Sequence, residues 1–375
     1  MNIFYDENMP LAPEFFGELG TITAFSGRDI TAEQLTEADV LLVRSITQVD
    51  QTLLENNHRI KFVGTATIGT DHIDKRYLQS RDIAFSSAPG CNAVSVAEYV
   101  ISALVNLSEK YLFDIKDKRV GIIGAGNTGS RLSEKLTALG VEHCLCDPIL
   151  AANGTDEREF VSLEQAVTCD VISLHVPKTL SGEHKTLHLL NADRLASLRD
   201  DQILINACRG EVVDNNALLD LKVNGHGLTL ALDVWEGEPN ILMPLLAHVD
   251  IATAHIAGYS LEGKSRGTEM LYQALCQQLA IAPNKSLNAC LPEPAITSVT
   301  INADFDQNLL IQMVKMVYDV KRDDGIFRQQ VSALGFDYIR KHYPVRREFS
   351  SIAVNNPKLC EIEPLNGLGF NVLPQ

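Results

Sequence analysis

Three ionisable residues follow short apolar segments in the second half of the chain: Arg209 in INACRGEVVD, Glu238 in ALDVWEGEP and His255 in ATAHIAGYS. Together these residue types suit proton transfer on an acidic substrate. A guanidinium binds a carboxylate through two parallel hydrogen bonds, an imidazole exchanges a proton near neutral pH, and a carboxylate can orient that imidazole. A lone histidine in an apolar segment is more often a hydrogen-bonded core residue. The chemistry therefore depends on whether the fold brings the three residues together.

A glycine-rich segment, VGIIGAGNTG, lies between an apolar stretch and a helical pattern. In a dinucleotide-binding loop the first glycine forms the tight turn, the second admits a pyrophosphate, and the third lets helix and strand pack closely. The N-terminus of the helix then offers N–H donors to the phosphates. Glycine-rich turns also occur without a ligand, but this context predicts dinucleotide binding by Gly124, Gly126, Asn127, Thr128 and Gly129.

Asp147 ends the next apolar segment, VEHCLCDP. It lies close to the spacing of about 20 residues that is expected for an acid binding the adenosine ribose hydroxyls. Because its charge would repel a 2′-phosphate, NAD is favoured over NADP as the cofactor. The alternative is a surface aspartate beside a structural turn.

The rest of the chain supplies the elements that must position these residues. Between residues 119 and 258, short apolar segments alternate with helical patterns, for example over 127–139 and 191–198. This alternation predicts an α/β fold with a Rossmann-type, doubly wound parallel sheet. Ligands bind beyond the carboxyl ends of the strands in such sheets, where the ionisable residues and the glycine loop would lie. The first ninety residues show a similar alternation through NIFYD, DVLLVRS and IKFVGTATIG.

Helices are also expected over residues 93–110 and about 264–280, and PNKSLNACLPEP is typical of a linker. Beyond this linker we expect a strand at ITSVTI, an amphipathic stretch over residues 306–320, and an irregular tail.

The composition limits the class of partner. The 375 residues are 45% hydrophobic and 21% charged, with a formal net charge of −16. This acidic balance argues against nucleic acid or an anionic membrane, because both require clustered Lys and Arg. We find no apolar stretch of about 18 residues and no signal-peptide pattern in MNIFYDENMP, so we expect no membrane span and a cytoplasmic protein. The eight cysteines are scattered, which favours reduced thiols.

The order of these motifs resembles that of the D-2-hydroxyacid dehydrogenase family: a glycine loop, Arg-Gly, Asp-x-x-x-x-Glu-Pro, and His before a glycine. The resemblance implies that Arg209 holds the substrate carboxylate and the C2 oxygen. It implies that His255 takes the hydroxyl proton while hydride leaves C2 for nicotinamide, and that Glu238 orients the imidazole and favours its charged form. Further contacts with NAD are implied for Val176, Ala207, Cys208, Asp233 and Gly258.

Other segments are similar to one branch of this family, which acts on a short phosphorylated hydroxyacid. They are VRS at residues 43–45, VGTATIGTDHID at 63–74, and GFDYIRKHYPVRREF in the tail. This closer resemblance assigns Ser45, Thr67 and Tyr259 to substrate binding. The alternatives are another phosphorylated hydroxyacid, such as 3-phosphoglycerate, and a NAD-sensing binding protein that keeps the dehydrogenase fold.

The resemblance implies three domains. They are a flavodoxin-like substrate domain (1–92 with 259–282), a Rossmann-type NAD-binding domain (93–258), and a C-terminal α+β dimerisation domain (283–375). The expected assembly is therefore a homodimer. Arg346 and Arg347 of the tail could reach a site across this dimer, or they could form a solvated basic surface.

Asp71, His72 and Asp74 form the remaining group that could bind a metal. Hydride transfer to nicotinamide needs no metal, so we expect none to be bound. We expect Asp71 to be a helix N-cap instead, with His72 and Asp74 in the first turn.

Overall fold

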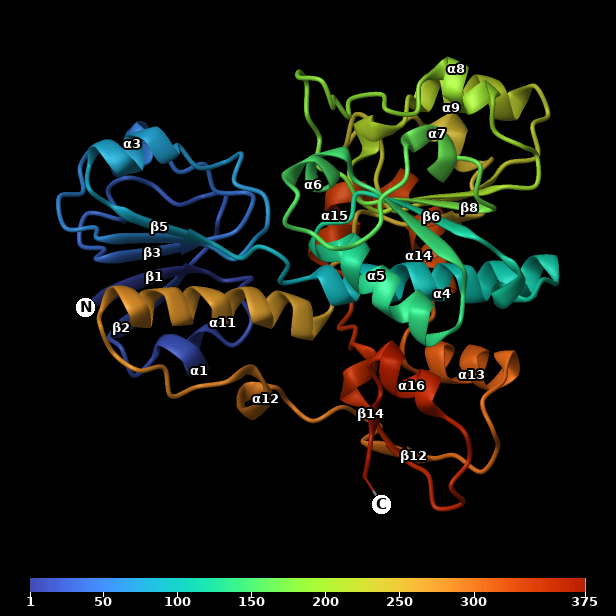
Figure 1. Ribbon diagram of the computed structural model, residues 1–375. Helices are drawn as coiled ribbons and strands as arrows, with labels where there is room; N and C mark the ends of the chain where they lie inside the picture. Colours follow the sequence, from blue (N-terminus) through green and yellow to red (C-terminus); the bar gives the residue numbers. More distant parts are fainter. Residues whose placement is uncertain (375) are drawn as a thin grey trace. The chain divides into compact units, whose positions relative to one another are not determined.

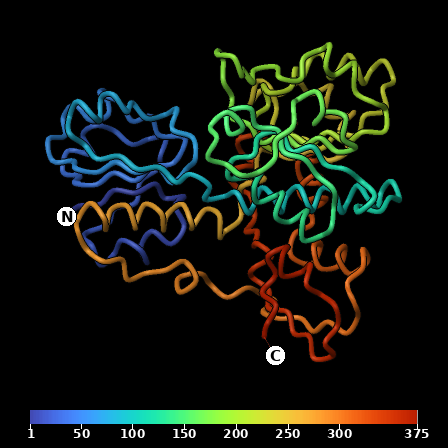
Figure 2. The backbone as a smooth tube through the Cα atoms, viewed as in Figure 1, coloured from blue at the N-terminus to red at the C-terminus, as the bar shows by residue number. Residues whose placement is uncertain are grey.

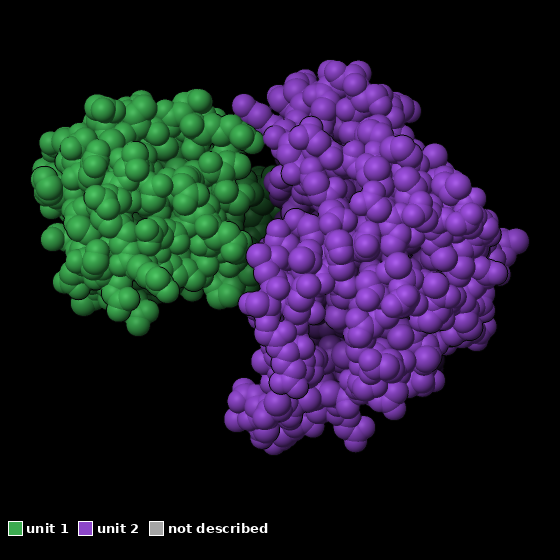
Figure 3. All heavy atoms as spheres, turned by 90° about the horizontal axis from the view of Figure 1, so that it is seen from above, with its two compact units in different colours: residues 1–92, 260–293 green, residues 93–259, 294–375 purple. Residues whose placement is uncertain are grey.

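The computed structural model describes residues 1–374, and the chain forms two units (Figure 3). Unit 1 consists of Met1–Asn92 and Ser260–Glu293, and unit 2 of Ala93–Tyr259 together with the residues from Pro294 onward. The C-terminal segment, for which the sequence predicts a separate domain, thus groups with the predicted NAD-binding segment. The three-domain division stays a prediction.

Unit 1 is built on five parallel strands in the order β2-β1-β3-β4-β5, which is typical of flavodoxin-like folds (Figure 1). Strand β3 shows that the sheet is buried on both faces. Val40 and Leu42 join one apolar cluster, and Leu41 and Val43 join the other, since successive side chains of a strand point to opposite faces. The strands are β1 (Asn2–Asp6), β2 (Thr21–Phe25), β3 (Val40–Val43), β4 (Phe62–Thr65) and β5 (Ala84–Ser87).

Helices from both segments of unit 1 cover this sheet. Leu271 and Leu275 of α11 pack in one cluster, and Leu54 of α2 and Leu78 of α3 pack in the other. Figure 2 shows α11, in orange, beside the blue N-terminal segments, and α11 contacts α1, β4 and β5. The helices are α1 (Ala12–Phe16), α2 (Gln51–Leu54), α3 (Lys75–Ser80), α11 (Leu261–Gln278) and, within the predicted linker, α12 (Leu287–Cys290).

Unit 2 contains six parallel strands in the order β11-β10-β9-β8-β6-β7. From β6 the chain passes to β7 on one side and then to β8 on the other. The strand order therefore reverses between β6 and β8, which is where doubly wound sheets bind ligands. The strands are β6 (Val120–Ile123), β7 (His143–Cys146), β8 (Val171–Leu174), β9 (Ile203–Asn206), β10 (Thr229–Leu232) and β11 (Ile251–Ala252).

Helix α4 (Ala93–Tyr111) is the central helix of unit 2. It is buried over most of its length, because α5, which follows β6, packs against it, and so do α13 and α14 of the C-terminal segment. The other helices between the strands are η1 (Ile115–Asp117), α5 (Asn127–Ala138), α6 (Pro148–Asn153), α7 (Leu163–Ala166), α8 (Ala192–Ala196), η2 (Gly210–Val212), α9 (Asn215–Val223) and α10 (Met243–Leu246).

The C-terminal segment is ordered, so the prediction of an irregular tail is wrong. The amphipathic stretch predicted over 306–320 is α13, and Asp319 caps a second helix, α14, that follows it directly. Val314, Tyr318 and Phe349 of this segment share one apolar cluster with Ile122 of β6. The elements are β12 (Ser298–Thr300), α13 (Gln307–Val317), α14 (Val320–Leu334), α15 (Phe336–Lys341), η3 (Phe349–Ser351), β13 (Ala353–Asn355), α16 (Glu363–Leu368) and β14 (Asn371–Val372).

The prediction that Asp71 caps a helix is also wrong. Asp74 is the N-cap of α3, and its carboxylate accepts a hydrogen bond from the Tyr77 N–H at 2.9 Å. His72 is buried before the helix, with Nε2 2.9 Å from the Thr65 hydroxyl, and this burial lowers the pKa of the imidazole.

All eight cysteines are unbridged. Among the described residues no helix combines the length and the hydropathy needed to cross a membrane.

Candidate active site

His255 follows β11, and Glu238 follows the neighbouring strand β10. The two side chains meet: His255 Nδ1 lies 2.8 Å from Glu238 Oε2, with 32% and 20% of the side chains exposed. The other carboxylate oxygen of Glu238 accepts a hydrogen bond from the Trp235 N–H at 2.8 Å. Both carboxylate oxygens of Glu238 are thus engaged, and the contact with His255 uses Nδ1 and not Nε2 of the ring.

The backbone of His255 is held as firmly as its ring. The residue adopts a left-handed conformation, with φ of 55°, which is uncommon outside glycine, and its N–H donates to the Asp233 carbonyl at 2.6 Å. The Asp233 carboxylate is buried and accepts three hydrogen bonds from the same loop. Its donors are the Thr253 hydroxyl (2.7 Å), Ile256 N (2.7 Å) and Ala257 N (2.9 Å).

Asp233 thus shapes the loop that carries His255, a role that the sequence alone does not reveal. Its predicted contact with the nicotinamide end stays a prediction.

Arg209 follows β9, the next strand of the same sheet. Its guanidinium is half-buried and donates to the Cys208 carbonyl at 2.6 Å. Gly210 packs so closely against the next loop that an added Cβ would lie 1.9 Å from the Trp235 carbonyl carbon. The loop of Arg209 therefore lies directly against the loop of Glu238. The structure places all three predicted catalytic residues after the carboxyl ends of adjacent strands.

The glycine loop has the geometry that a pyrophosphate needs. Gly124 has φ of +95°, and an added Cβ would lie 2.6 Å from the carbonyl carbon of His175. At Gly129 an added Cβ would lie 2.0 Å from the Gly124 oxygen, so the third glycine permits close packing. Gly126 has nothing within 4 Å of an added Cβ, and no side chain caps α5. The N–H donors at Asn127 and Thr128 are therefore available to an anion.

Asp147 directly follows β7, at the strand end predicted from the apolar segment VEHCLCDP. Its carboxylate caps α6 by accepting from Leu150 N at 3.1 Å, and it accepts from Ala125 N in the glycine loop at 3.0 Å. These bonds hold the acid beside the loop, and its predicted contact with the adenosine ribose stays a prediction. Arg158, which no motif in the sequence marks, donates to the Ala125 carbonyl at 3.0 Å and supports the loop from another side.

The other predicted cofactor residues follow strand ends of the same sheet. Val176 comes after β8, Ala207 and Cys208 after β9, and Gly258 after the His255 loop. Burial raises the pKa of the Cys208 thiol to about 11, so this cysteine is a neutral thiol near neutral pH. Their contacts with NAD stay predictions.

The predicted substrate residues belong to both units. Ser45 is exposed after β3, and Thr67 follows β4 and donates to the Gly69 carbonyl at 2.9 Å. Tyr259 is the last residue before unit 1 resumes, and its hydroxyl accepts a hydrogen bond from Arg340 at 3.1 Å. Their roles in substrate binding stay predictions.

Arg346 does not form the surface or the cross-dimer contact predicted for it. It is only 2% exposed, and it donates to the carbonyls of Ala257 (3.0 Å) and Ser95. Its guanidinium carbon also lies 3.7 Å from the centre of the Tyr318 ring. The residue therefore anchors the C-terminal segment to the loop that follows His255.

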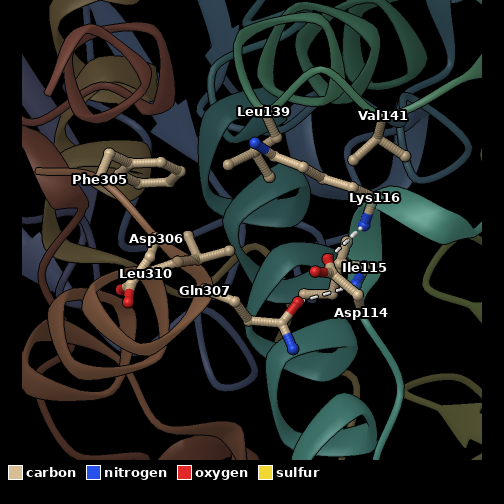
Figure 4. Close-up of a pocket in the computed structure, with 9 residues that line it drawn as sticks. All are labelled: Asp114, Ile115, Lys116, Leu139, Val141, Phe305, Asp306, Gln307 and Leu310. Atoms are coloured by element: carbon tan, nitrogen blue, oxygen red, sulfur yellow. Dashed lines mark hydrogen bonds between the residues drawn. The ribbon is translucent and has the colours of Figure 1, made fainter. Parts of the chain in front are cut away.

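Two other features of unit 2 lie outside this group of predicted site residues. His188, Asp214 and Glu236 form the one group in the described chain with metal-ligand spacing, but His188 Nε2 and Glu236 Oε1 already pair at 2.6 Å. Figure 4 shows a cavity of about 230 Å³. The side-chain oxygen of Gln307, which lines it, accepts a hydrogen bond from Ile115 N. The cavity is lined by Asp114, Ile115, Lys116, Leu139, Val141, Phe305, Asp306, Gln307 and Leu310.

Comparisons with known proteins agree with this geometry. Residues 98–257 match the NAD binding domain of the D-isomer specific 2-hydroxyacid dehydrogenases, and residues 290–369 match a domain of unknown function, DUF3410. The chain is 59% identical to an erythronate-4-phosphate dehydrogenase of Colwellia psychrerythraea, over 99% of this chain and 100% of the relative. It is 52% identical to the enzyme of the same name from Tolumonas auensis, over 99% of both chains.

Solved structures share the fold. The D-lactate dehydrogenase of Aquifex aeolicus, complexed with NAD and lactic acid, matches with a TM-score of 0.59 and 25% identity, over 74% of this chain and 96% of that one. The NAD-dependent formate dehydrogenase of Staphylococcus aureus, in complex with NAD, matches with a TM-score of 0.56 and 23% identity, over 76% and 98% of the two chains.

Proposed function

The chain belongs to the erythronate-4-phosphate dehydrogenases within the NAD-dependent D-2-hydroxyacid dehydrogenase family, and from this membership we propose its substrate and the roles of its residues. The proposed reaction is oxidation of 4-phospho-D-erythronate to 3-hydroxy-2-oxo-4-phosphooxybutanoate, a step of pyridoxal 5′-phosphate biosynthesis. The observation that carries the proposal is the hydrogen-bonded pair of His255 and Glu238. The two residues follow strands of the same sheet whose strand β6 leads into the glycine loop.

In the proposed mechanism His255 acts as the base. Glu238 occupies Nδ1, so Nε2 is the nitrogen that takes the proton from the substrate C2 hydroxyl. Glu238 holds the ring in place and stabilises the positive charge that the ring gains. Arg209 binds the substrate carboxylate and the C2 oxygen, which fixes the C2–H bond in the orientation for transfer.

NAD supplies the hydride acceptor when it is bound. Asn127 and Thr128, at the start of α5, would donate N–H groups to its pyrophosphate, and Asp147 would bind the adenosine ribose. Val176, Ala207, Cys208, Asp233 and Gly258 are proposed to line the nicotinamide end.

Ser45, Thr67 and Tyr259 are proposed to bind the polyol and phosphate oxygens of the substrate through their hydroxyls. We also propose a cytoplasmic homodimer assembled through residues 283–375. Light scattering coupled to size-exclusion chromatography tests the dimer, since a mass of one chain at all concentrations would exclude it.

The substrate is tested by mixing the protein with NAD and one hydroxyacid at a time and following absorbance of the reduced nicotinamide. We expect turnover with 4-phospho-D-erythronate and at least tenfold lower kcat/KM with 3-phosphoglycerate, because the site should match one chain length better. Turnover with phosphoglycerate alone would replace the proposed substrate. Activity should be unchanged after treatment with a chelator, since no metal is proposed.

A further inference from the structure

The C-terminal segment brings one arginine to Tyr259. Arg340, on α15, donates from Nη2 to the Tyr259 hydroxyl at 3.1 Å, and its guanidinium carbon lies 5.7 Å from the centre of the Tyr259 ring. Both residues belong to unit 2. The domain of unknown function therefore contacts a residue that family resemblance assigns to substrate binding.

The position of Arg340 is fixed by the packing of its helix. Phe336 and Ile339 of α15 are buried in the apolar cluster that also contains Trp235. The ring of Phe327 contacts both Phe336 and Trp235, with ring centres 5.9 Å and 5.7 Å apart. The arginine is thus held by the same core that holds the loop of Glu238.

The guanidinium of Arg340 is short of partners. In the part of the chain that the structure describes, it forms no ion pair, and its Nε is buried without a hydrogen bond. The buried acid of the same segment, Asp323, is bonded to the hydroxyls of Tyr318 and Tyr343 instead. The Nη groups of Arg340 carry further N–H donors, and an anion that accepts from them would form charge-assisted hydrogen bonds.

Two contacts fix the position of Tyr259 beside Arg340. The Tyr343 ring packs edge-on against it at 6.0 Å, and Tyr259 N donates to the Ile256 carbonyl at 2.8 Å, one residue after His255. An oxyanion next to the Tyr259 hydroxyl therefore also lies within reach of the guanidinium fork of Arg340.

We propose that Arg340, together with Tyr259, binds the phosphate of the substrate and so sets the specificity for a phosphorylated hydroxyacid. This inference rests on the proposed function, in which Arg209 takes the carboxylate at the other end of the same molecule. A chain with a net charge of −16 repels a substrate with two anionic groups, which increases the need for a second dedicated cation.

The test compares kcat/KM for 4-phospho-D-erythronate and for unphosphorylated D-erythronate, both with saturating NAD, in the wild type and in Arg340→Gln. The glutamine variant should lose about 10- to 100-fold in kcat/KM for the phosphorylated substrate only, as expected for a charged hydrogen bond. Arg340→Lys keeps the charge but not the fork, so it should recover part of the preference. Lys341→Gln, an exposed cation on the same helix, is the matched control and should behave as wild type.

Each outcome decides the matter. If Arg340→Gln lowers kcat/KM equally for both substrates, Arg340 supports the loop and does not read the phosphate. If it changes neither value while thermal unfolding shows a folded protein, the inference is wrong although the proposed function stands. A wild type that does not oxidise 4-phospho-D-erythronate at all overturns the proposed function itself, and the inference with it.

Discussion

The left-handed backbone of His255 restricts which substitutions test its chemistry cleanly. An alanine at φ of 55° would add backbone strain to the loss of the imidazole, whereas asparagine tolerates this conformation. We expect His255→Asn to lower kcat by about 10²- to 10⁴-fold, because the general base is lost. The NAD dissociation constant should stay within about threefold of wild type, since the phosphates bind elsewhere. Both are measured by steady-state kinetics and calorimetric titration.

His188 offers a matched control, since it too adopts a left-handed conformation, with φ of 50°. Because its ring pairs with Glu236 and is not among the proposed catalytic residues, His188→Asn should keep kcat within a few-fold of wild type. An equal loss in both variants would show that backbone conformation, not proton transfer, explains the defect.

A second histidine has the opposite character. Burial lowers the pKa of His175 to about 4, and its Nε2 lies 2.8 Å from the Ser173 hydroxyl. In the unfolded chain the pKa is about 6.5, so the folded state favours the neutral ring above that pH and loses this stability as the pH falls towards 4. We expect about 2 kcal/mol less unfolding free energy from this group at pH 5 than at pH 7.5.

Urea unfolding of the wild type and of His175→Gln at both pH values measures this contribution. The glutamine cannot titrate, so the variant should show a smaller difference between the two pH values. An identical pH dependence in the two proteins would mean that another group controls acid stability.

At the scale of elements, two glycines of the glycine loop are expected to serve different purposes, Gly124 in folding and Gly126 in cofactor binding. Gly126 has an ordinary φ of −70°, and an added Cβ would meet nothing within 4 Å. Gly126→Ala should therefore keep the melting temperature but weaken NAD binding by about tenfold or more, because the methyl group fills space needed by the pyrophosphate. Gly124→Ala should instead cost about 1–3 kcal/mol of stability, since it combines a φ of +95° with the contact to His175. Scanning calorimetry measures the stability of each variant, and calorimetric titration measures its affinity for NAD. Unchanged NAD affinity in Gly126→Ala would mean that the pyrophosphate does not bind at this loop.

The strand ends of unit 2 could be predicted because several local signals agreed. Apolar stretches such as VISL at 171–174 and ILIN at 203–206 are buried on both faces, and a parallel sheet places their carboxyl ends on one edge. The order of Arg209, Glu238 and His255 after such stretches then implied that they converge. Asp233 could not be assigned in the same way. Its hydrogen bonds to Thr253, Ile256 and Ala257 join the loops that follow β10 and β11. No periodicity in the sequence indicates hydrogen bonds between residues that lie so far apart along the chain.

The helix starts show the limits of local signals. GTDHID offers two aspartates that could cap a helix, and side-chain chemistry alone does not choose between Asp71 and Asp74. The choice is made by tertiary structure, because His72 is buried against Thr65 of β4 and the helix can begin only after it. The same limit applies to the tail, where α15 and α16 are each six residues long and too short for a clear helical period.

At the scale of the whole molecule, the C-terminal segment is part of the core of unit 2. Its helices α13 and α14 pack against α4, and Ser102 of α4 donates to the Tyr318 carbonyl at 2.9 Å and accepts from Val320 N at 3.0 Å. The family resemblance assigns this segment to dimerisation, which stays a prediction, and the contacts within one chain show that the segment also packs in the core of unit 2.

Arg346 is the residue through which this integration can be measured. Fully buried, it joins the segment to Ala257, whose N–H is held by Asp233 in the loop of His255. Arg346→Met removes the donors to the carbonyls of Ala257 and Ser95 and the contact of the guanidinium with the Tyr318 ring, so we expect a loss of about 3–5 kcal/mol in unfolding free energy. Because the Ala257 carbonyl loses its partner, kcat should fall in the fraction that remains folded. Lys321→Met, at an exposed position of α14 in the same segment, should change stability by no more than about 0.5 kcal/mol. Chemical unfolding of the wild type and the two variants, followed by the fluorescence of Trp235, measures these changes. An equally small change in both variants would mean that the C-terminal segment does not stabilise the loop of His255.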